Sequence, residues 1–142
     1  MRILVTGGCG FIGNHVVRNA LLIPGVERVV NIDALTYSGN LENLKDVDDS
    51  RYQFVHGSIN DSTLVETLLE DENISVILHL AAESHVDRSI NSVQPFIETN
   101  VDGTRVLLES VVERTAEGVP IHFVHISTAV SYTHLRAHET HE

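Results

Sequence analysis

The chain has 142 residues, with 9 Lys and Arg against 20 Asp and Glu, so its formal net charge is −11. This acidic balance argues against nucleic acid or an anionic membrane as a partner, because both need a basic surface. A hydrophobic share of 42% is typical of one globular domain. No apolar run approaches the ~20 residues of a membrane span, and the single Cys9 forms no disulfide within the chain. A strand-like start leaves no room for a signal peptide, so we expect a cytoplasmic protein.

Apolar runs alternate with helix-like stretches along the chain. We expect strands at residues 2–6, 27–32, 51–56, 74–80 and 121–127. We expect helices at residues 11–22, in a short piece at 41–47, from an N-cap at Asp61 through Leu69, and at 93–115. Strands rich in Val and Ile that alternate with helices predict an α/β fold, with a parallel sheet covered on both faces.

Three glycines, Gly7, Gly10 and Gly13, have a G-x-x-G-x-x-G spacing between the first expected strand and helix. Such a turn lets a pyrophosphate approach the backbone at a helix N-terminus. Asp33 follows Gly13 by 20 residues, where a carboxylate accepts hydrogen bonds from ribose hydroxyls and repels a 2′-phosphate. The pattern predicts NAD rather than NADP. A ligand-free glycine turn and a loop-capping Asp33 are the alternatives, and Cys9 is expected only to fill the turn.

The stretches TGGCGFIG, NIDALTYSGNLENL, HLAAESHVDRSI and FIETNVDGT resemble the dTDP-glucose 4,6-dehydratases, a family of extended short-chain dehydrogenases/reductases. The resemblance runs from Met1 to Thr128. It implies a Rossmann-type doubly wound parallel sheet with strand order 3-2-1-4-5, truncated before the later strands and the substrate domain. It also implies NAD as cofactor, and conversion of dTDP-glucose to dTDP-4-keto-6-deoxyglucose and water through transient reduction of NAD. The full-length protein would be a homodimer.

The resemblance implies roles for individual positions. The cofactor-binding set comprises Gly7, Gly10, Phe11, Ile12, Gly13, Asp33, Ala34, Leu35, Thr36, Ser58, Ile59, Leu80, Ala81, Ala82, Glu83, Ser84 and Thr99. Ser84 would also face the sugar nucleotide, and Thr128 would bind the reacting hydroxyl of the substrate. Ser58 stands where the family usually has Asp, a departure that we expect to weaken one hydrogen bond to the adenine.

Several of these positions also have a purely structural interpretation. Ala81 and Ala82 suit the end of a strand beneath a helix, and Glu83 suits a solvated loop with local ion pairs. His79 lies within an apolar run, where a histidine is more often a hydrogen-bonded core residue than a ligand.

The chain lacks the residues that the family's chemistry implies. A Tyr-x-x-x-Lys pair would supply the base, but no tyrosine here has a lysine at that spacing. An Asp-Glu pair would follow Ser127-Thr128, but Ala129 and Val130 stand there. We therefore expect no catalytic residue and no activity from this chain alone. A nucleotide-sugar 4-epimerase or decarboxylase and a non-catalytic NAD-binding module are the alternative functions.

The last residues differ abruptly from the rest. Residues 130–140, VSYTHLRAHET, are similar to the translation of a common transposase sequencing adapter, with Ala129 as a junction codon. We therefore expect a native NAD-binding domain at residues 1–128 and a non-native tail at 129–142. A zinc site of His134, His138 and His141 on one helix face is the alternative, and we expect no metal.

Overall fold

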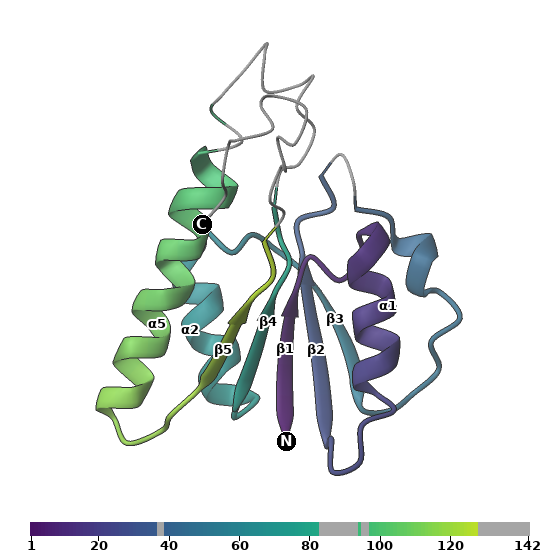
Figure 1. Ribbon diagram of the computed structural model, residues 1–142, viewed down its shortest axis with the longest axis horizontal. Coiled ribbons are helices and arrows are strands. Elements are labelled where there is room, and N and C mark those ends of the chain that lie inside the picture. The colour runs from purple at the N-terminus through teal and green to yellow at the C-terminus, as the bar shows by residue number, and fades with distance from the viewer. Residues whose placement is uncertain (37–38, 83–93, 95–96, 128–142) are drawn as a thin grey trace, which may run out of the picture.

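The computed structural model describes residues 1–36, 39–82, 94 and 97–127, which form a parallel sheet between helices (Figure 1). Glu83, Ser84, Thr128 and the tail at 129–142 lie outside the described residues. The sheet has the order β3-β2-β1-β4-β5, so the expected fold class and strand order are confirmed. The strands are β1 Arg2–Thr6, β2 Arg28–Asp33, β3 Tyr52–His56, β4 Val76–His79 and β5 His122–His125.

The central strands form around short apolar runs, Ile3–Val5 in β1, Val29–Val30 in β2 and Val76–Leu78 in β4. β1 is buried from Ile3 onward, and Val5 lies in register with Asn31 on one side and Leu78 on the other. A strand that is paired on both edges and covered on both faces needs such a continuous apolar run. The order in which strands are added reverses at β1, because β2 and β3 lie on one side of it and β4 and β5 on the other.

Helices cover both faces of the sheet. The described helices are α1 Phe11–Ala20, the 3₁₀ helix η1 Leu41–Leu44, α2 Ser62–Asp71, the π-helix η2 Ile97–Gly103 and α5 Thr104–Ala116. In Figure 1, α1 lies on one side of the sheet, and α2 and α5 lie on the other. Leu69 and Leu107 pack with Ile77 in one core, and Val17 packs with Val29 in the second.

Local chemistry explains where the helices begin and end. The carboxylate of Asp61 accepts a hydrogen bond from the Leu64 N–H at 3.1 Å, which confirms the expected N-cap of α2. α1 ends at Ala20, two residues before the expected end, because the Leu22 N–H turns back to the Asn19 carbonyl at 3.0 Å. This tighter turn is a common way to close the last turn of a helix.

The helix expected at 93–115 is not uniform over its described part. It runs as a π-helix to Gly103 and as an α-helix only from Thr104. Asn60 donates its amide to the Glu98 carbonyl at 2.8 Å, and the Thr104 hydroxyl donates to the Asn100 carbonyl at 3.1 Å. The first bond joins η2 to the turn after β3, and the second joins η2 to the first residue of α5.

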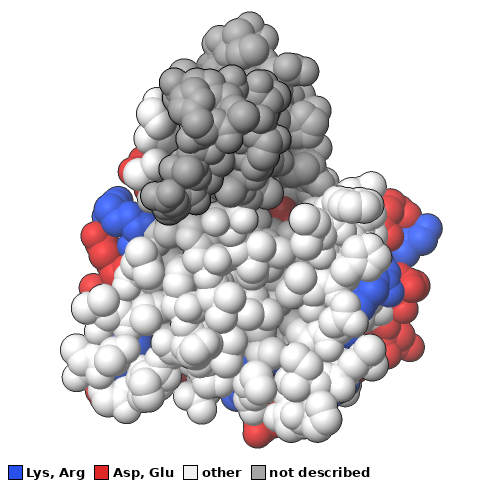
Figure 2. Space-filling view, viewed as in Figure 1, with Lys and Arg blue, Asp and Glu red and all other residues white. Residues whose placement is uncertain are grey.

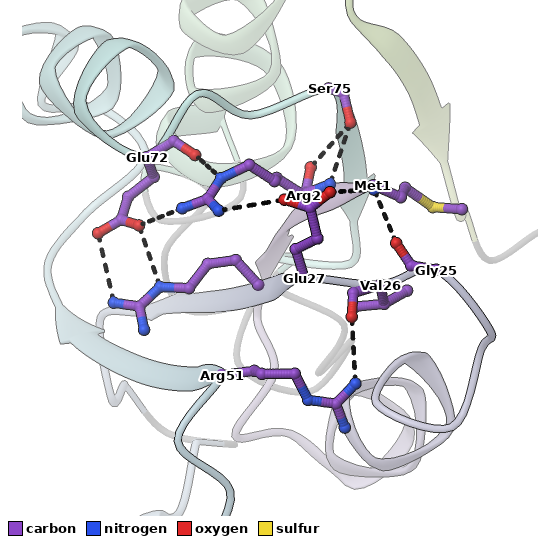
Figure 3. Close-up of polar contacts among 9 residues, drawn as sticks. Met1, Arg2, Gly25, Val26, Glu27, Arg51, Glu72 and Ser75 are labelled. Carbon is purple, nitrogen blue, oxygen red and sulfur yellow. Dashed lines mark hydrogen bonds and ion pairs between the residues drawn. The ribbon is translucent and has the colours of Figure 1, made fainter.

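Ion pairs tie the amino ends of the strands together (Figure 3). Glu72, at the end of α2, pairs with Arg28 at 3.0 Å and with Arg2 at 3.4 Å, and its carboxylate is only 18% exposed. The hydroxyl of Ser75 accepts the Arg2 N–H at 3.1 Å. Since these bonds join β1, β2 and the segment before β4, they fix the amino edge of the sheet.

Most other charged side chains are exposed, whereas Asp33 is buried. Figure 2 shows charged residues mainly at the two flanks of the viewed face, with uncharged residues over its middle. The exposed pairs include Arg105–Glu109 on α5 and Lys45–Glu42 at η1. Exposed pairs of this kind add little stability. Within the described part of the chain, no helix has the length and apolar character that spanning a membrane requires.

Candidate functional site

A cleft of about 390 Å³ opens at the carboxyl ends of the strands, opposite the Arg2–Glu72 ion pairs. Ligands of open α/β sheets bind at this edge, where the strand order reverses. Fourteen of the sequence-predicted site residues line the cleft: Gly7, Gly10, Phe11, Ile12, Gly13, Asp33, Ala34, Thr36, Ser58, Ile59, Leu80, Ala81, Ala82 and Thr99. The fold thus brings together predicted site residues that are separated by up to 92 residues, from Gly7 to Thr99, and the whole lining extends to Ile126.

The glycine loop between β1 and α1 forms the middle of the cleft. Gly7 has φ +74°, and a Cβ on it would lie 2.7 Å from the Ala81 nitrogen. A Cβ on Gly13 would overlap the carbonyl oxygen of Gly7. Only glycine at these two positions lets the first turn of α1 contact the loop this closely.

The N-terminus of α1 has, within the described part of the chain, neither a capping side chain nor an acidic residue in its first turn. Gly10 is the N-cap and supplies no side-chain hydrogen bond, and the first turn has no acidic residue. The side chains of Phe11 and Ile12 are 82% and 56% exposed, so they do not cover this end of the helix. Unsatisfied N–H groups and the helix dipole together favour an anion here, such as a phosphate.

Two side chains of β2 accept hydrogen bonds from the backbone of the glycine loop. Asn31 Oδ1 accepts the Gly8 N–H at 2.9 Å, and Asp33 Oδ2 accepts the Cys9 N–H at 2.8 Å. Asp33 Oδ1 accepts the Leu35 N–H at 2.8 Å. A carboxylate has about four acceptor positions, so Asp33 retains capacity for hydroxyl donors in the cleft. This geometry fits the ribose of a nucleotide.

Two loop residues play structural parts. Cys9 is fully buried, and burial together with the nearby Asp33 charge raises the pKa of its thiol to about 11. Cys9 therefore fills the turn, as expected, and is no thiolate nucleophile. Leu35 has φ 55° and packs in the core beneath α1, so its side chain is absent from the cleft lining. Its contribution is the N–H that orients Asp33.

The β3 side of the cleft contains a small polar turn. The Ser58 hydroxyl accepts the Asn60 N–H at 3.1 Å, and Asn60 connects this turn to η2 through the Glu98 carbonyl. Asn60 lines the cleft, although the sequence did not single it out. An Asn two residues after Ser58 could have indicated the turn, but not its contact with η2. Ile32, Gly39, Gly57 and Ile126 also line the cleft and were not predicted.

His79 lies beneath the β4 side of the cleft and is a buried core residue, as the sequence indicated. Its Nδ1 lies 2.6 Å from the Thr6 hydroxyl, and its Nε2 lies 2.9 Å from the Thr104 hydroxyl. Burial, and secondarily His125 with its ring centroid 4.8 Å away, lower the pKa of His79 to about 4. The ring is therefore neutral at physiological pH.

Among the described residues no group of three or more His, Cys, Asp or Glu side chains could hold a metal ion. The alternative zinc ligands, His134, His138 and His141, lie outside the described residues. So do Glu83, Ser84 and Thr128, whose expected roles in binding the cofactor and the substrate stay predictions.

The cleft has the layout that a dinucleotide needs. Its β2–β3 half presents Asp33 and a polar turn, its middle presents the N-terminus of α1, and its β4–β5 half presents small residues. A ligand with a diphosphate between two nucleoside halves would place its charge at the helix N-terminus.

Comparison with known proteins agrees with this layout. The family model for GDP-mannose 4,6 dehydratase matches residues 4–142. A dTDP-glucose 4,6-dehydratase from Shigella flexneri is 53% identical over 111 residues, which are 78% of this chain and 30% of that protein. The chain therefore spans about a third of the length of such relatives.

Solved structures give the same result. The dTDP-glucose 4,6-dehydratase DesIV from Streptomyces venezuelae, determined with NAD bound, matches with a TM-score of 0.75 and 49% identity over 81% of this chain and 37% of that one. The UDP-glucose 4-epimerase of Thermotoga maritima matches with a TM-score of 0.76 and 33% identity over 90% of this chain and 38% of that one. The resemblance stated from the sequence is thus confirmed, and the chain belongs to the GDP-mannose 4,6 dehydratase family.

Proposed function

We propose that the chain binds NAD in this cleft and forms the cofactor-binding part of a dTDP-glucose 4,6-dehydratase. The observation that carries the proposal is the uncapped N-terminus of α1 beside the carboxylate of Asp33. The diphosphate of NAD would accept the N–H groups around Gly10, and the adenosine ribose would donate to Asp33. That DesIV was solved with NAD supports this assignment.

The two ends of NAD would meet different walls of the cleft. Ser58 and Ile59, after β3, are positioned for the adenine. Leu80, Ala81 and Ala82, after β4, together with Thr99 on η2, are positioned for the nicotinamide half. The small side chains of Ala81 and Ala82 leave room for a flat ring. Asp33 would repel the 2′-phosphate of NADP, so NAD is the preferred cofactor.

The proposed reaction is the loss of water from dTDP-glucose to give dTDP-4-keto-6-deoxyglucose. Bound NAD supplies a hydride acceptor that is regenerated in each turnover. Ser84 and Thr128 are the substrate-binding residues that we propose within this chain. Because Ala129 and Val130 stand where the resemblance implies Asp-Glu, we propose that the chain alone binds cofactor without turnover. The 4-epimerase alternative has less support, since the epimerase of Thermotoga maritima is 33% identical against 49% for DesIV.

Calorimetric titration of the full chain with NAD and NADP tests the binding proposal. We expect NAD to bind and NADP to bind at least tenfold more weakly, which is about 1.4 kcal/mol. Asp33→Asn keeps the shape of the side chain and removes its charge. The substitution should therefore reduce the difference in affinity between NAD and NADP. Equal binding of both cofactors by the unaltered chain would refute the role of Asp33.

Three further proposals follow from the family. The complete protein acts as a homodimer in the cytoplasm. Light scattering tests the oligomeric state, and cell fractionation tests the location.

Residues 129–142 are a non-native tail, and re-reading the source DNA across the Thr128 codon tests this. A codon pair for Asp-Glu after Thr128 supports the proposal, whereas the present codons in an independent read overturn it. An assay of the complete protein with dTDP-glucose tests the activity, with mass spectrometry to detect the loss of one water from the substrate.

A further inference from the structure

His79 is a buried ionisable residue that the proposed cofactor contacts do not use. It is fully buried and does not line the cleft. Yet both of its ring nitrogens have a hydroxyl partner, and these hydroxyls come from opposite walls: Thr6 belongs to β1, and Thr104 begins α5.

The hydrogen-bond directions follow from the Thr104 side, where the hydroxyl donates its one proton to the Asn100 carbonyl and must therefore accept from His79 Nε2. With the ring proton on Nε2, His79 Nδ1 accepts the Thr6 hydroxyl proton at 2.6 Å. Thr6 Oγ1 in turn accepts the Ala81 N–H at 3.1 Å and shares the Leu80 N–H, also at 3.1 Å, with the Thr6 carbonyl oxygen at 3.0 Å. His79 is consequently neutral, and its own proton is on Nε2.

All of these bonds run in the same direction. His79 Nε2–H donates to Thr104 Oγ1 at 2.9 Å, and the Thr104 hydroxyl donates to the Asn100 carbonyl at 3.1 Å. One directed series thus runs from Leu80 and Ala81 through three side chains to η2. Aligned hydrogen bonds polarise one another, and a low dielectric strengthens them. The stacked ring of His125 and the nearby Phe123 cover His79 on the β5 side.

The two ends of this series coincide with two walls of the cleft. Leu80 and Ala81 line the cleft at one end, and η2, which contains Asn100, also carries the lining residue Thr99. We propose that His79 is a positioning residue, which through Thr6 and Thr104 sets the separation between the β4 end and η2 in the nicotinamide half of the cleft. This inference rests on the proposed NAD binding.

Thr104 offers the cleanest test, because it lies outside the cleft lining and its substitution spares Thr6 and His79. Thr104→Val keeps the shape of the side chain and removes the hydroxyl, whereas Thr104→Ser keeps the hydroxyl. Binding of NAD and of ADP would be measured calorimetrically on the full chain. ADP carries the adenosine and diphosphate groups but no nicotinamide, so it reports on the other half of the cleft.

We expect Thr104→Val to weaken NAD binding about threefold to tenfold, as for loss of one buried hydrogen bond. ADP binding should be unchanged, and Thr104→Ser should restore NAD binding. An equal loss for NAD and ADP, or no loss for either, would overturn the positioning role. If the unaltered chain binds neither NAD nor ADP, the proposed function itself fails.

A second measurement does not depend on any ligand. The ¹⁵N chemical shifts of the His79 ring distinguish a proton on Nε2 from one on Nδ1. We expect the Nε2–H form in the unaltered chain and in Thr104→Ser. In Thr104→Val the Nε2–H loses its acceptor, so its signal should shift. Finding the Nδ1–H form in the unaltered chain would contradict the direction of the series and the proposal with it.

Discussion

Acidification should destabilise the folded chain through His79 as the pH falls below 6.5. Nδ1 of this ring accepts the Thr6 hydroxyl proton, so protonation there would set two donors against each other. The folded pKa is lowered from 6.5 to about 4, first by burial and second by His125. Between pH 6.5 and about pH 4, His79 is protonated in the unfolded chain and remains neutral in the folded chain. Stability is therefore fully present above pH 6.5, falls as the pH drops through this window, and levels off below about pH 4.

The size of the effect follows from the two pKa values. One pKa unit corresponds to about 1.4 kcal/mol, so the drop from 6.5 to about 4 gives roughly 3 kcal/mol in total. From about pH 7.5 to about pH 5.5 the expected loss is about 1.3 kcal/mol, because only the unfolded histidine becomes protonated in that range. The Asp49 carboxyl, whose pKa Arg51 holds at about 2, titrates well below this range.

Urea unfolding at these two pH values measures the effect, with His79→Gln as a control that cannot titrate. The free energy of unfolding should fall by about 1.3 kcal/mol more in the unaltered chain than in the control. Comparing the two chains removes the contributions of the other histidines. The same pH dependence in both chains would refute the reasoning, and so would an NMR titration that places the pKa of His79 near 6.5.

Three other substitutions test the loop, its support and the amino edge of the sheet. Gly13→Ala should lower stability by about 1–3 kcal/mol and weaken NAD binding, because the new Cβ would overlap the Gly7 carbonyl. An NAD affinity of the variant equal to that of the unaltered chain, measured by calorimetry, would count against this. Asn31→Leu should cost about 1–3 kcal/mol in urea unfolding, since it leaves the buried Gly8 N–H without its acceptor; an unchanged midpoint would contradict it. Glu72→Gln should lower stability by about 1–2 kcal/mol through its ion pairs to Arg2 and Arg28. It should leave NAD affinity as it was, and a parallel loss of affinity would show that the two ends of the sheet are coupled.

Features set by local sequence could be predicted well. The strands follow from short runs rich in Val, Ile and Leu. The start of α2 follows from Asp61, whose carboxylate caps the N–H of Leu64 three residues later. The glycine spacing between β1 and α1 predicted the loop, because only glycine tolerates the contact between Gly13 and Gly7. The strand order came from the family resemblance and agrees with the structure.

Features set by distant contacts could not be predicted. Asn60 bonds to Glu98 of η2 across 38 residues of sequence, a contact that no local pattern indicates. Likewise, Asn31 supports the glycine loop only because β2 lies beside β1, and its partner Gly8 is 23 residues away. Periodicity says nothing about such pairs. Leu35 shows a further limit, because its positive φ directs the side chain into the core beneath α1 and away from the cleft.

The parallel sheet gives the molecule two ends with separate tasks. Every strand starts at the edge tied by Glu72 and Arg28 and finishes at the edge that forms the cleft. Loops at the finishing edge can be lengthened or exchanged to accept new ligands, while the starting edge keeps the strands aligned. The same polarity has an experimental use, because a side chain introduced at Gly25 would meet open space, and attachment there would orient the cleft away from a surface.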